Sequence, residues 1–332
     1  MTSSAAQLFE PASLAARIAA ADTQPGNNEL MRFCFGTKPD SNSASRCIIH
    51  VPLPRLDDSN TCEIWESSEP VSSGVSGGVQ FARTDSWLAL HTTTPLMADD
   101  DLSIITEDIY TRLIKEALSQ GYTDIVRTWN YVPDINLGSA DTERYRQFTL
   151  GRAIAFDRLG FRDSKLPAGT GIGGDASIPL SITLLVTRKP CRRVENPRQI
   201  SAYNYPKQYG PRSPSFSRAV LIGNTEKPLL LVSGTASIVG HETMHTGLAE
   251  QAGETCANIR TLQDVAAAHL QIDKRMQATG QGTYLRIYLR NDSDTDAALT
   301  ALQGLIKEAE GYVVLQGDIC RDDLLLEIEA VC

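Results

Sequence analysis

The chain has 332 residues, of which 42% are hydrophobic and 21% charged, and its formal net charge at pH 7 is −9. This composition is typical of a folded globular protein and excludes a disordered or fibrous chain. The negative charge argues against a nucleic-acid partner, which would need a basic face. No apolar run reaches the roughly 18 residues of a membrane-spanning helix, and the first residues lack the pattern of a signal peptide. The sequence therefore predicts a cytoplasmic protein without membrane or nucleic-acid partners.

Residues 1–80 are rich in Ser, Asn, Asp and Pro, with short strand-like runs at 46–53 and 61–67. This pattern predicts an irregular or β-rich N-terminal region. The segment 66–79 is dominated by Ser and Gly and has few apolar side chains to bury, so we expect it to be an exposed loop.

A regular order of strands and helices follows, and it occurs twice. In the first half, hydrophobic periodicity predicts a strand at 86–95, a helix at 102–121, a strand at 124–132, a helix from about 141 to 160, and strands at 167–174 and 180–188. In the second half it predicts a strand at 229–237, a helix at 251–270, a strand at 283–290, a helix at 295–311, and strands at 312–319 and 324–331. The repeated order predicts an α+β protein with two tandem modules, 81–190 and 229–332, each a mixed β-sheet with helices packed on one face.

The segment 191–228 joins the two predicted modules and is dense in Arg, Tyr and Pro. It is too aromatic for a simple spacer and too rich in proline for a helix, so it is a candidate wall of a binding site. Its aromatic and basic residues are Tyr203, Tyr205, Tyr209, Arg212, Phe216 and Arg218, and the predicted helix before it carries Tyr145, Arg146 and Arg152. Guanidinium groups bind carboxylates in bidentate fashion and tyrosine hydroxyls add directed hydrogen bonds, which suits a small carboxylated, ring-shaped substrate. For any one of these arginines, an ordinary surface role stays open.

The C-terminal strand 324–331 carries two glutamates at alternate positions. Period-two alternation puts Leu326 and Ile328 on one face and Glu327 and Glu329 together on the other. If the second face is buried, desolvation and like charge raise the pKa of one carboxyl group toward the range of a general acid. The alternative is a half-exposed strand with two solvated glutamates, and the pattern alone does not decide between them.

Two short motifs suggest other chemistry. His241 to His245 spell HETMH, a match to the H-E-x-x-H zinc motif, which needs both histidines on one turn of a helix. Gly240 and Gly247 bracket the motif and a strand-like run precedes it, which argues against that helix. The glycines of 166–175 lack the G-K-S/T of a phosphate-binding loop, and we interpret them as a tight turn.

Several segments together resemble the chorismatases, enzymes that join two modules of the RidA (YjgF) fold, also called chorismate mutase-like. The segments are 129–136, 144–153, 205–219, the SGTAS of 233–237, and 320–329. The resemblance covers about residues 80–332, and the Tyr/Pro/Arg segment is its most specific part. It makes the HETMH match a coincidence of the loop after SGTAS.

The resemblance implies that the protein splits pyruvate from chorismate without a metal or organic cofactor. Glu327 would protonate the methylene carbon of the enolpyruvyl ether, and Arg152, Tyr209 and Arg218 would hold the carboxylates. The other residues expected around the substrate are Tyr145, Arg146, Tyr205, Gly234, Ala236 and Cys320, the last as a second catalytic residue.

The product is left open by the sequence. Cys320 resembles members that form 3-hydroxybenzoate, alone or with 4-hydroxybenzoate, whereas Ala236 resembles members that form 3,4-dihydroxycyclohexa-1,5-dienoate. We favour hydroxybenzoate, because a thiol can take part in the chemistry and a methyl group only shapes the pocket. A zinc hydrolase using HETMH and a non-catalytic RidA-like ligand-binding protein are the alternatives. The duplicated modules are compatible with a monomer or a homotrimer.

Overall fold

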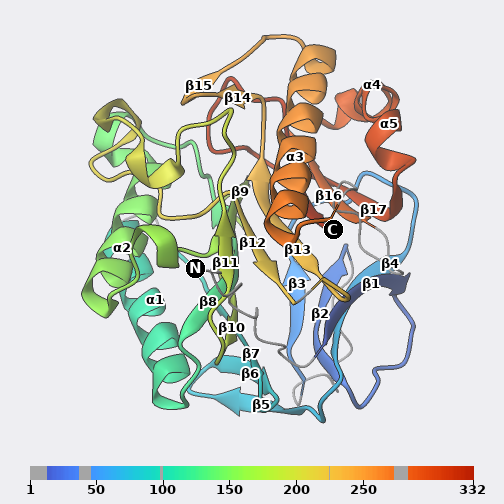
Figure 1. Cartoon of the computed structure of the whole chain (residues 1–332). Coiled ribbons are helices and arrows are strands. Elements are labelled where there is room, and N and C mark those ends of the chain that lie inside the picture. The colour runs from blue at the N-terminus through green and yellow to red at the C-terminus, as the bar shows by residue number, and fades with distance from the viewer. Residues whose placement is uncertain (1–12, 37–45, 98–99, 224, 273–282) are drawn as a thin grey trace, which may run out of the picture.

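A computed structural model describes residues 13–36, 46–97, 100–223, 225–272 and 283–332, and Figure 1 shows its arrangement. The described residues form a small N-terminal sheet, two larger sheets, each covered by helices, and a two-stranded hairpin. None of the described helices is both long enough and apolar enough to cross a membrane.

The N-terminal region forms a four-stranded sheet in the order β1-β4-β2-β3. Its strands are β1 (Leu14–Ala20), β2 (Glu29–Phe35), β3 (Ile48–Val51) and β4 (Thr61–Ser67). Strand β4 pairs antiparallel with both β1 and β2, which makes it a central strand. Phe33, Phe35 and Trp65 of this sheet pack in one core with residues of the two large sheets.

The first large sheet has the strand order β5-β6-β7-β10-β8-β9. Its strands are β5 (Ser72–Ser76), β6 (Val79–Arg83), β7 (Trp87–Thr94), β8 (Asp124–Pro133), β9 (Ala168–Gly174) and β10 (Leu180–Thr187), and its helices are α1 (Leu102–Ser119) and α2 (Arg144–Leu159). The expected loop at 66–79 is wrong in part, because 72–76 form an edge strand whose backbone bonds to β6 need no apolar side chains. Strands β5 and β6 also extend this sheet upstream of residue 81.

The second large sheet has the strand order β11-β12-β13-β18-β16-β17. Its strands are β11 (Arg192–Val194), β12 (Ala219–Ile222), β13 (Leu229–Thr235), β16 (Thr283–Leu289), β17 (Ala309–Gln316) and β18 (Leu326–Val331), and its helices are α3 (Leu248–Leu270), α4 (Thr295–Ala301) and α5 (Gln303–Ile306). The hairpin β14 (Ile238–Val239) and β15 (Glu242–Thr243) follows β13. Strands β11 and β12 lie within the segment 191–228 and form the edge of this sheet. Short 3-10 helices lie at Ala140–Thr142, Asp163–Lys165, Ala202–Asn204, Lys207–Tyr209 and Asp292–Asp294.

The two large sheets share one topology. In each, the third strand along the chain pairs with the last strand, and the fourth and fifth strands form a parallel pair, β8 with β9 and β16 with β17. The predicted α+β fold with two tandem modules is confirmed. The predicted helix at 295–311 is wrong at its end, because the chain turns at Leu302 and β17 already begins at Ala309 to pair with β16.

Three of the hydrophobic cores among the described residues hold these layers together. One lies between the first sheet and α1 and α2, and another between the second sheet and α3 to α5. The third is enclosed by the N-terminal sheet and the opposite faces of the two large sheets. Figure 1 shows α1 and α2 on one flank, α3 to α5 on the other, and the N-terminal sheet below α3.

Strand β9 joins the two modules. Gly173 exchanges two backbone hydrogen bonds with Asp318 (2.7 and 2.9 Å), and Gly169 N donates to Ser233 Oγ at 2.9 Å. The strand predicted at 167–174 is confirmed as β9, so the interpretation of its glycines as a tight turn is wrong. A Cβ atom on Gly173 would lie 2.9 Å from Cβ of Asp318, so glycine permits the close approach of the two modules.

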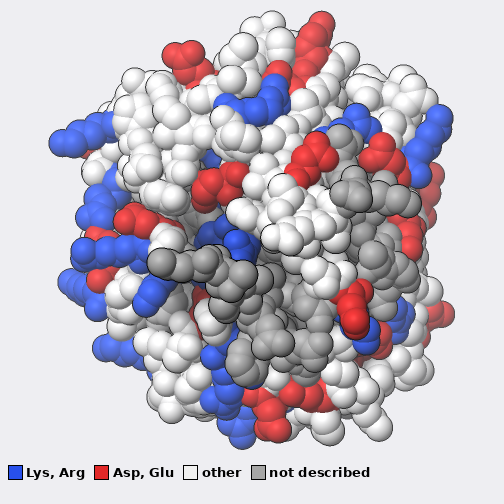
Figure 2. Space-filling model, in the orientation of Figure 1, with Lys and Arg blue, Asp and Glu red and all other residues white. Residues whose placement is uncertain are grey.

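Charged side chains are dispersed over the outer surface. Figure 2 shows acidic and basic groups interspersed on one face, with basic groups spaced along the left edge, on the side of α1 and α2. The net charge of −9 is therefore not gathered into one acidic patch in this view.

Candidate active site

A cavity of about 640 Å³ lies where the two modules meet. Its wall combines α2 and β9 of the first module, residues of the 191–228 segment, and β13, the β14–β15 hairpin and β18 of the second module. The ten residues expected to contact a substrate all line it: Tyr145, Arg146, Arg152, Tyr205, Tyr209, Arg218, Gly234, Ala236, Cys320 and Glu327. Of the other candidates for the wall, Phe216 lines the cavity, but Tyr203 packs against the core under α1 and α2 and Arg212 pairs with Asp157. The fold thus brings together residues that are up to 182 positions apart in the sequence.

Glu327 projects from β18 into this cavity. The predicted alternation is confirmed, because Leu326 and Ile328 belong to the core under α3 to α5 while both glutamates are on the other face. Glu327 is only 5% exposed. Its burial and the negative charge of Glu329 raise the pKa of its carboxyl group to about 8, against the opposing effects of Arg127 and Arg218. Glu327 is therefore largely protonated at neutral pH, as a general acid must be.

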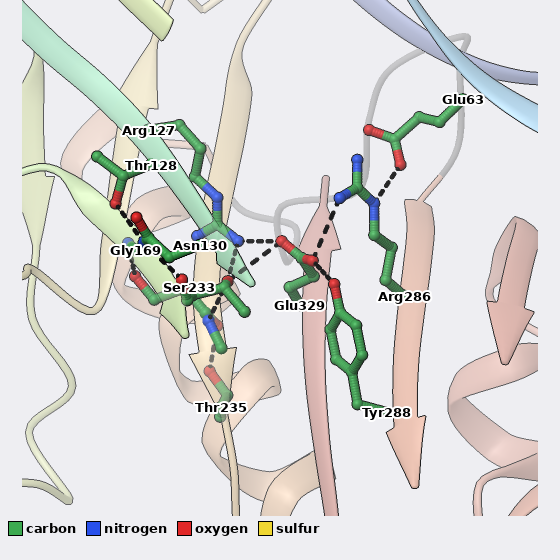
Figure 3. Close-up of polar contacts among 12 residues, drawn as sticks. Glu63, Arg127, Thr128, Asn130, Gly169, Ser233, Thr235, Arg286, Tyr288 and Glu329 are labelled. Carbon is green, nitrogen blue, oxygen red and sulfur yellow. Dashed lines mark hydrogen bonds and ion pairs between the residues drawn. The ribbon is translucent and has the colours of Figure 1, made fainter. Parts of the chain in front are cut away.

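Glu329 lies two residues after Glu327 on β18, and Figure 3 shows the polar groups that surround it. Arg127 and Tyr288 donate hydrogen bonds to its two carboxylate oxygens, and Thr170 Oγ1 donates at 3.2 Å. Burial opposes ionisation of Glu329, but Arg286 and Arg127 outweigh it and lower its pKa. Two neighbouring carboxyl groups are thus driven to opposite protonation states, an arrangement that is common at acid–base sites.

Gly234 makes room for the Glu327 carboxyl group. The pairing of β13 with β18 shifts register between Val232 and Thr235, which leaves an irregularity at Gly234. Gly234 N donates to Thr170 Oγ1 at 3.1 Å, which fixes the backbone at this point. A Cβ atom on residue 234 would lie 2.8 Å from Cδ of Glu327, so a side chain there would displace the acid.

Two buried arginines line the cavity with hydrogen-bonding capacity to spare. Arg152 packs its guanidinium over the ring of Phe148 at 5.0 Å, and its Nε has no hydrogen-bond partner among the described residues. Arg218 donates through Nη2 to Tyr205 Oη at 2.7 Å and to a backbone carbonyl, while its Nε also lacks a partner in the described part of the chain. Unpaired buried donors of this kind are costly. Both residues line the cavity, where a guanidinium group can form charge-assisted hydrogen bonds with a carboxylate.

Cys320 and Tyr145 lie on one side of Glu327. Burial and the charge of Glu327 raise the pKa of the Cys320 thiol to about 12, so it is a neutral thiol at physiological pH. Burial and the nearby Cys320 likewise raise the pKa of Tyr145. Both groups can donate a proton in a hydrogen bond, but neither is an activated nucleophile in this state.

Arg146 and Tyr209 lie elsewhere on the wall. Arg146 Nε donates to Glu143 at 2.9 Å, so part of its charge is already neutralised. Tyr209 Oη donates to the backbone carbonyl of His241 at 2.7 Å, which ties the 191–228 segment to the β14–β15 hairpin. This contact closes one side of the cavity.

Many lining residues were not predicted from the sequence, and two of them bear on the chemistry of the site. The guanidinium of Arg321 lies 4.1 Å from the ring centre of Tyr209, which adds a further cation to the wall. Its position directly after Cys320 was the only available signal. Thr170 also lines the cavity, bridging Gly234 and Glu329, and nothing in the glycine-rich sequence around it marks it.

The HETMH motif does not form a zinc site of the predicted kind. Glu242 and Thr243 are in β15, His245 has a positive φ of 67°, and α3 begins only at Leu248. The two histidines are therefore not on one helical turn. Within the described ranges, no cluster of three or more His, Cys, Asp or Glu residues could hold a metal ion.

Comparison with known proteins identifies relatives of this chain. A chorismatase from Streptomyces hygroscopicus is 34% identical over 296 residues, which cover 87% of this chain and 84% of the relative. The chain belongs to the chorismatase family. The model of the family described as chorismatase FkbO/Hyg5-like, N-terminal, matches residues 63–186.

Two further members support this assignment. A 3-hydroxybenzoate synthase from Streptomyces hygroscopicus is 32% identical over 279 residues, covering 81% of this chain and 80% of the relative. A chorismatase crystal structure at 1.08 Å resolution superposes with a TM-score of 0.84 at 29% identity, covering 97% of this chain and 99% of the other. The protein is therefore a chorismatase-family enzyme.

Proposed function

We propose that this enzyme converts chorismate to pyruvate and a hydroxybenzoate, with Glu327 as the proton donor. The observation that carries the proposal is the state of Glu327, a buried carboxyl group whose pKa is raised to about 8 beside the ionised Glu329. The names of the relatives at 32–34% identity supply the substrate class.

In the proposed reaction, Glu327 transfers its proton to the terminal methylene carbon of the enolpyruvyl ether. The C=C bond becomes a methyl group and an adjacent oxocarbenium centre, which activates the ether toward cleavage. Forming dihydroxycyclohexadienoate then consumes one water, whereas forming hydroxybenzoate and pyruvate consumes no net water. The two product classes therefore diverge after the proton transfer.

Chorismate carries two carboxylates, and the buried cations of the cavity suit both. Arg152 and Arg218 line it, and Arg321 adds a third cation beside Tyr209. If both carboxylates are held, the terminal methylene carbon is fixed next to Glu327. This positioning increases the rate of proton transfer. Tyr145, Tyr205 and Arg146 complete the proposed substrate contacts.

The hydroxybenzoate product is favoured by Cys320. Its thiol is neutral and lies beside Glu327 and Tyr145, so it can donate a hydrogen bond or a proton to the ring oxygen while the ring is converted to an aromatic product. Ala236 packs with Ile319 and Leu324 at the edge of the cavity and shapes the pocket without chemistry of its own.

The test is to incubate the purified enzyme with chorismate and to identify the products by chromatography. We expect pyruvate and 3-hydroxybenzoate, with or without the 4-isomer, and no pyruvate above background from Glu327→Gln. Undiminished pyruvate release by that variant would exclude the assigned acid. Cys320→Ala should still release pyruvate but shift the second product toward dihydroxycyclohexadienoate, while the buried Cys256→Ala serves as the control.

The core arrangement favours a monomer. The two large sheets and the N-terminal sheet of one chain enclose a common core, so no second chain is needed to cover them. Light scattering coupled to size-exclusion chromatography distinguishes the 36.2 kDa monomer from a trimer.

A further inference from the structure

A chain of buried charges runs from the N-terminal sheet to the back of the active site. Arg286 on β16 donates through Nε to Glu63 Oε2 at 2.8 Å and through Nη1 to Glu329 Oε1 at 3.5 Å. Arg127 on β8 pairs with the other oxygen of Glu329. The four side chains alternate in sign and are at most 5% exposed.

The four residues come from three sheets: Glu63 from the N-terminal sheet, Arg127 from the first large sheet, and Arg286 and Glu329 from the second. Glu63 lies on β4 and accepts a hydrogen bond from Trp65 Nε1 at 2.6 Å. Arg286 stacks over Phe33 of β2 at 4.0 Å. The N-terminal sheet thus supplies Glu63 at one end of this series of charges. The two modules supply Arg286, Glu329 and Arg127 (Figure 3).

Glu329 is fixed as an anion by this arrangement. Both of its oxygens accept hydrogen bonds, from Tyr288 and Arg286 on one side and from Arg127 and Thr170 on the other. A carboxylate that accepts several hydrogen bonds, two of them from guanidinium groups, keeps its charge. Glu329 therefore cannot deliver a proton itself.

Glu327 is the nearest carboxyl group along the same face of β18. Residues two apart on a strand are separated by about 7 Å, and between buried groups at that distance a fixed negative charge strongly opposes a second ionisation. The other titratable or charged groups around Glu327 come from each packed element: Arg127 on β8, Tyr145 and Arg152 on α2, Arg218 before β12, Arg286 and Tyr288 on β16, and Cys320 and Arg321 before β18. Of these, Arg127 and Arg218 favour the ionised form of Glu327.

We propose that Glu329 is a positioning residue that keeps Glu327 in its acid form, and that Glu63 supports it from the N-terminal sheet through Arg286. This inference rests on the proposed function, because it assigns the role of Glu329 in the same proton transfer. It also gives the N-terminal sheet a part in catalysis, although no described residue of that sheet lines the cavity.

The inference is tested by the pH dependence of kcat/KM for pyruvate release. Removing the charge of Glu329 with Glu329→Gln leaves Arg127 and Arg286 uncompensated, so Glu327 ionises more readily. We expect the alkaline limb of the profile to shift to lower pH by about one unit or more. Glu63→Gln should move the limb in the same direction by less, because Arg286 lies between the two glutamates.

A matched control lies on the same strand as Glu63. Glu66 on β4 pairs with Arg17 at 2.9 Å and is about one-third exposed. It is not part of the buried series Glu63, Arg286, Glu329 and Arg127. Glu66→Gln should leave the profile unchanged. Glu329→Gln removes a partner from two buried arginines and is the variant most at risk of misfolding. Glu63→Gln therefore serves as the second variant, and near-UV circular dichroism checks the fold of both.

A folded variant with lower activity at all pH values and an unmoved alkaline limb would overturn the inference, because a merely structural role predicts that result. The proposed function is separable by a measurement without turnover. The carboxyl carbon-13 resonance of Glu327, assigned by its loss in Glu327→Gln, should titrate at lower pH in both variants. An enzyme that releases no pyruvate while this shift occurs contradicts the proposed function alone, and an unshifted titration contradicts the role of Glu329.

Discussion

Gly234 and Glu327 face each other across β13 and β18 so closely that residue 234 has no room for a side chain. A Cβ atom on it would lie 2.8 Å from the carboxyl carbon of Glu327 and 3.3 Å from the methyl carbon of Thr170. The position of the proposed acid therefore depends on the absence of a side chain on the neighbouring strand.

Replacing Gly234 with alanine should displace the Glu327 carboxyl group. A misplacement of about 1 Å at a reacting group costs on the order of 100-fold in rate, so we expect kcat for pyruvate release to fall about that much. Steady-state kinetics with chorismate measures the effect.

Gly253→Ala is the matched control for this substitution. Gly253 lies within α3, and a Cβ atom there would meet nothing within 4 Å. Alanine also favours a helix more than glycine, so this variant should keep its activity and unfold at the same or a higher temperature. Full activity of Gly234→Ala would show that Glu327 is free to adopt another position.

Glu327 should make the stability of the protein depend on pH. Its pKa is raised from 4.5 to about 8 on folding, so the folded state binds this proton more tightly than the unfolded state. The resulting stabilisation is complete below pH 4.5, is lost as the pH rises and is gone above pH 8. Over that interval the free energy of unfolding should fall by up to about 1.4 kcal/mol per pH unit.

The neutral variant Glu327→Gln removes this dependence. Its denaturant midpoint should exceed that of the wild type by an increasing margin between pH 5 and pH 8.5, as followed by urea unfolding at each pH. An equal difference at every pH would show that Glu327 is ionised in the folded protein.

The sequence predicts features that depend on local residues. The alternation of β18 needs only the identities of residues 324–331, so the shared face of Glu327 and Glu329 could be predicted. The buried state of that face could not, since it depends on how the sheets pack. Arg127 and Glu329 are 202 positions apart, and no periodicity in either strand indicates that they pair.

The wrong predictions also concern features that depend on contacts between distant residues. Glycines in a short run usually mark a turn, but in β9 they let two modules approach, a requirement set by Asp318 and Ile135 elsewhere in the chain. The helical region predicted at 295–311 is shorter in the structure, because β17 pairs with β16 and this pairing is again a tertiary contact. The arginines and tyrosines around the substrate could be proposed from their residue types, whereas Gly234, Ala236 and Cys320 came from the family resemblance alone, which carries information on long-range contacts.

Removal of metal should not affect the reaction. His245 Nε2 lies 3.5 Å from the carboxylate of Glu254, and His241 Nδ1 lies 3.1 Å from Tyr209 Oη, so the two histidines contact different partners. We expect unchanged pyruvate release after dialysis against a strong chelator, and the same rate for His245→Gln. Restoration of a lost rate by added zinc would support the hydrolase alternative.

Arg152 should determine the affinity for the substrate carboxylate. Its guanidinium is largely buried on α2, and the residue lines the cavity. Loss of one partner of a buried charge pair costs about 2–5 kcal/mol, so Arg152→Gln should lower kcat/KM by roughly 30-fold or more. The kcat/KM of Arg152→Lys should lie between those of the wild type and Arg152→Gln, because lysine keeps the charge but loses the bidentate geometry.

The same helix offers a control for this series. Arg158 also lies on α2, but its side chain is 65% exposed and pairs with Glu107 on the surface, so Arg158→Gln should leave kcat/KM unchanged. Binding to Glu327→Gln, which cannot consume chorismate by the proposed route, separates affinity from chemistry when measured by calorimetry. Chorismate should bind this inactive variant well and the double variant with Arg152→Gln at least about tenfold more weakly. Equal affinities would remove Arg152 from the proposed carboxylate site.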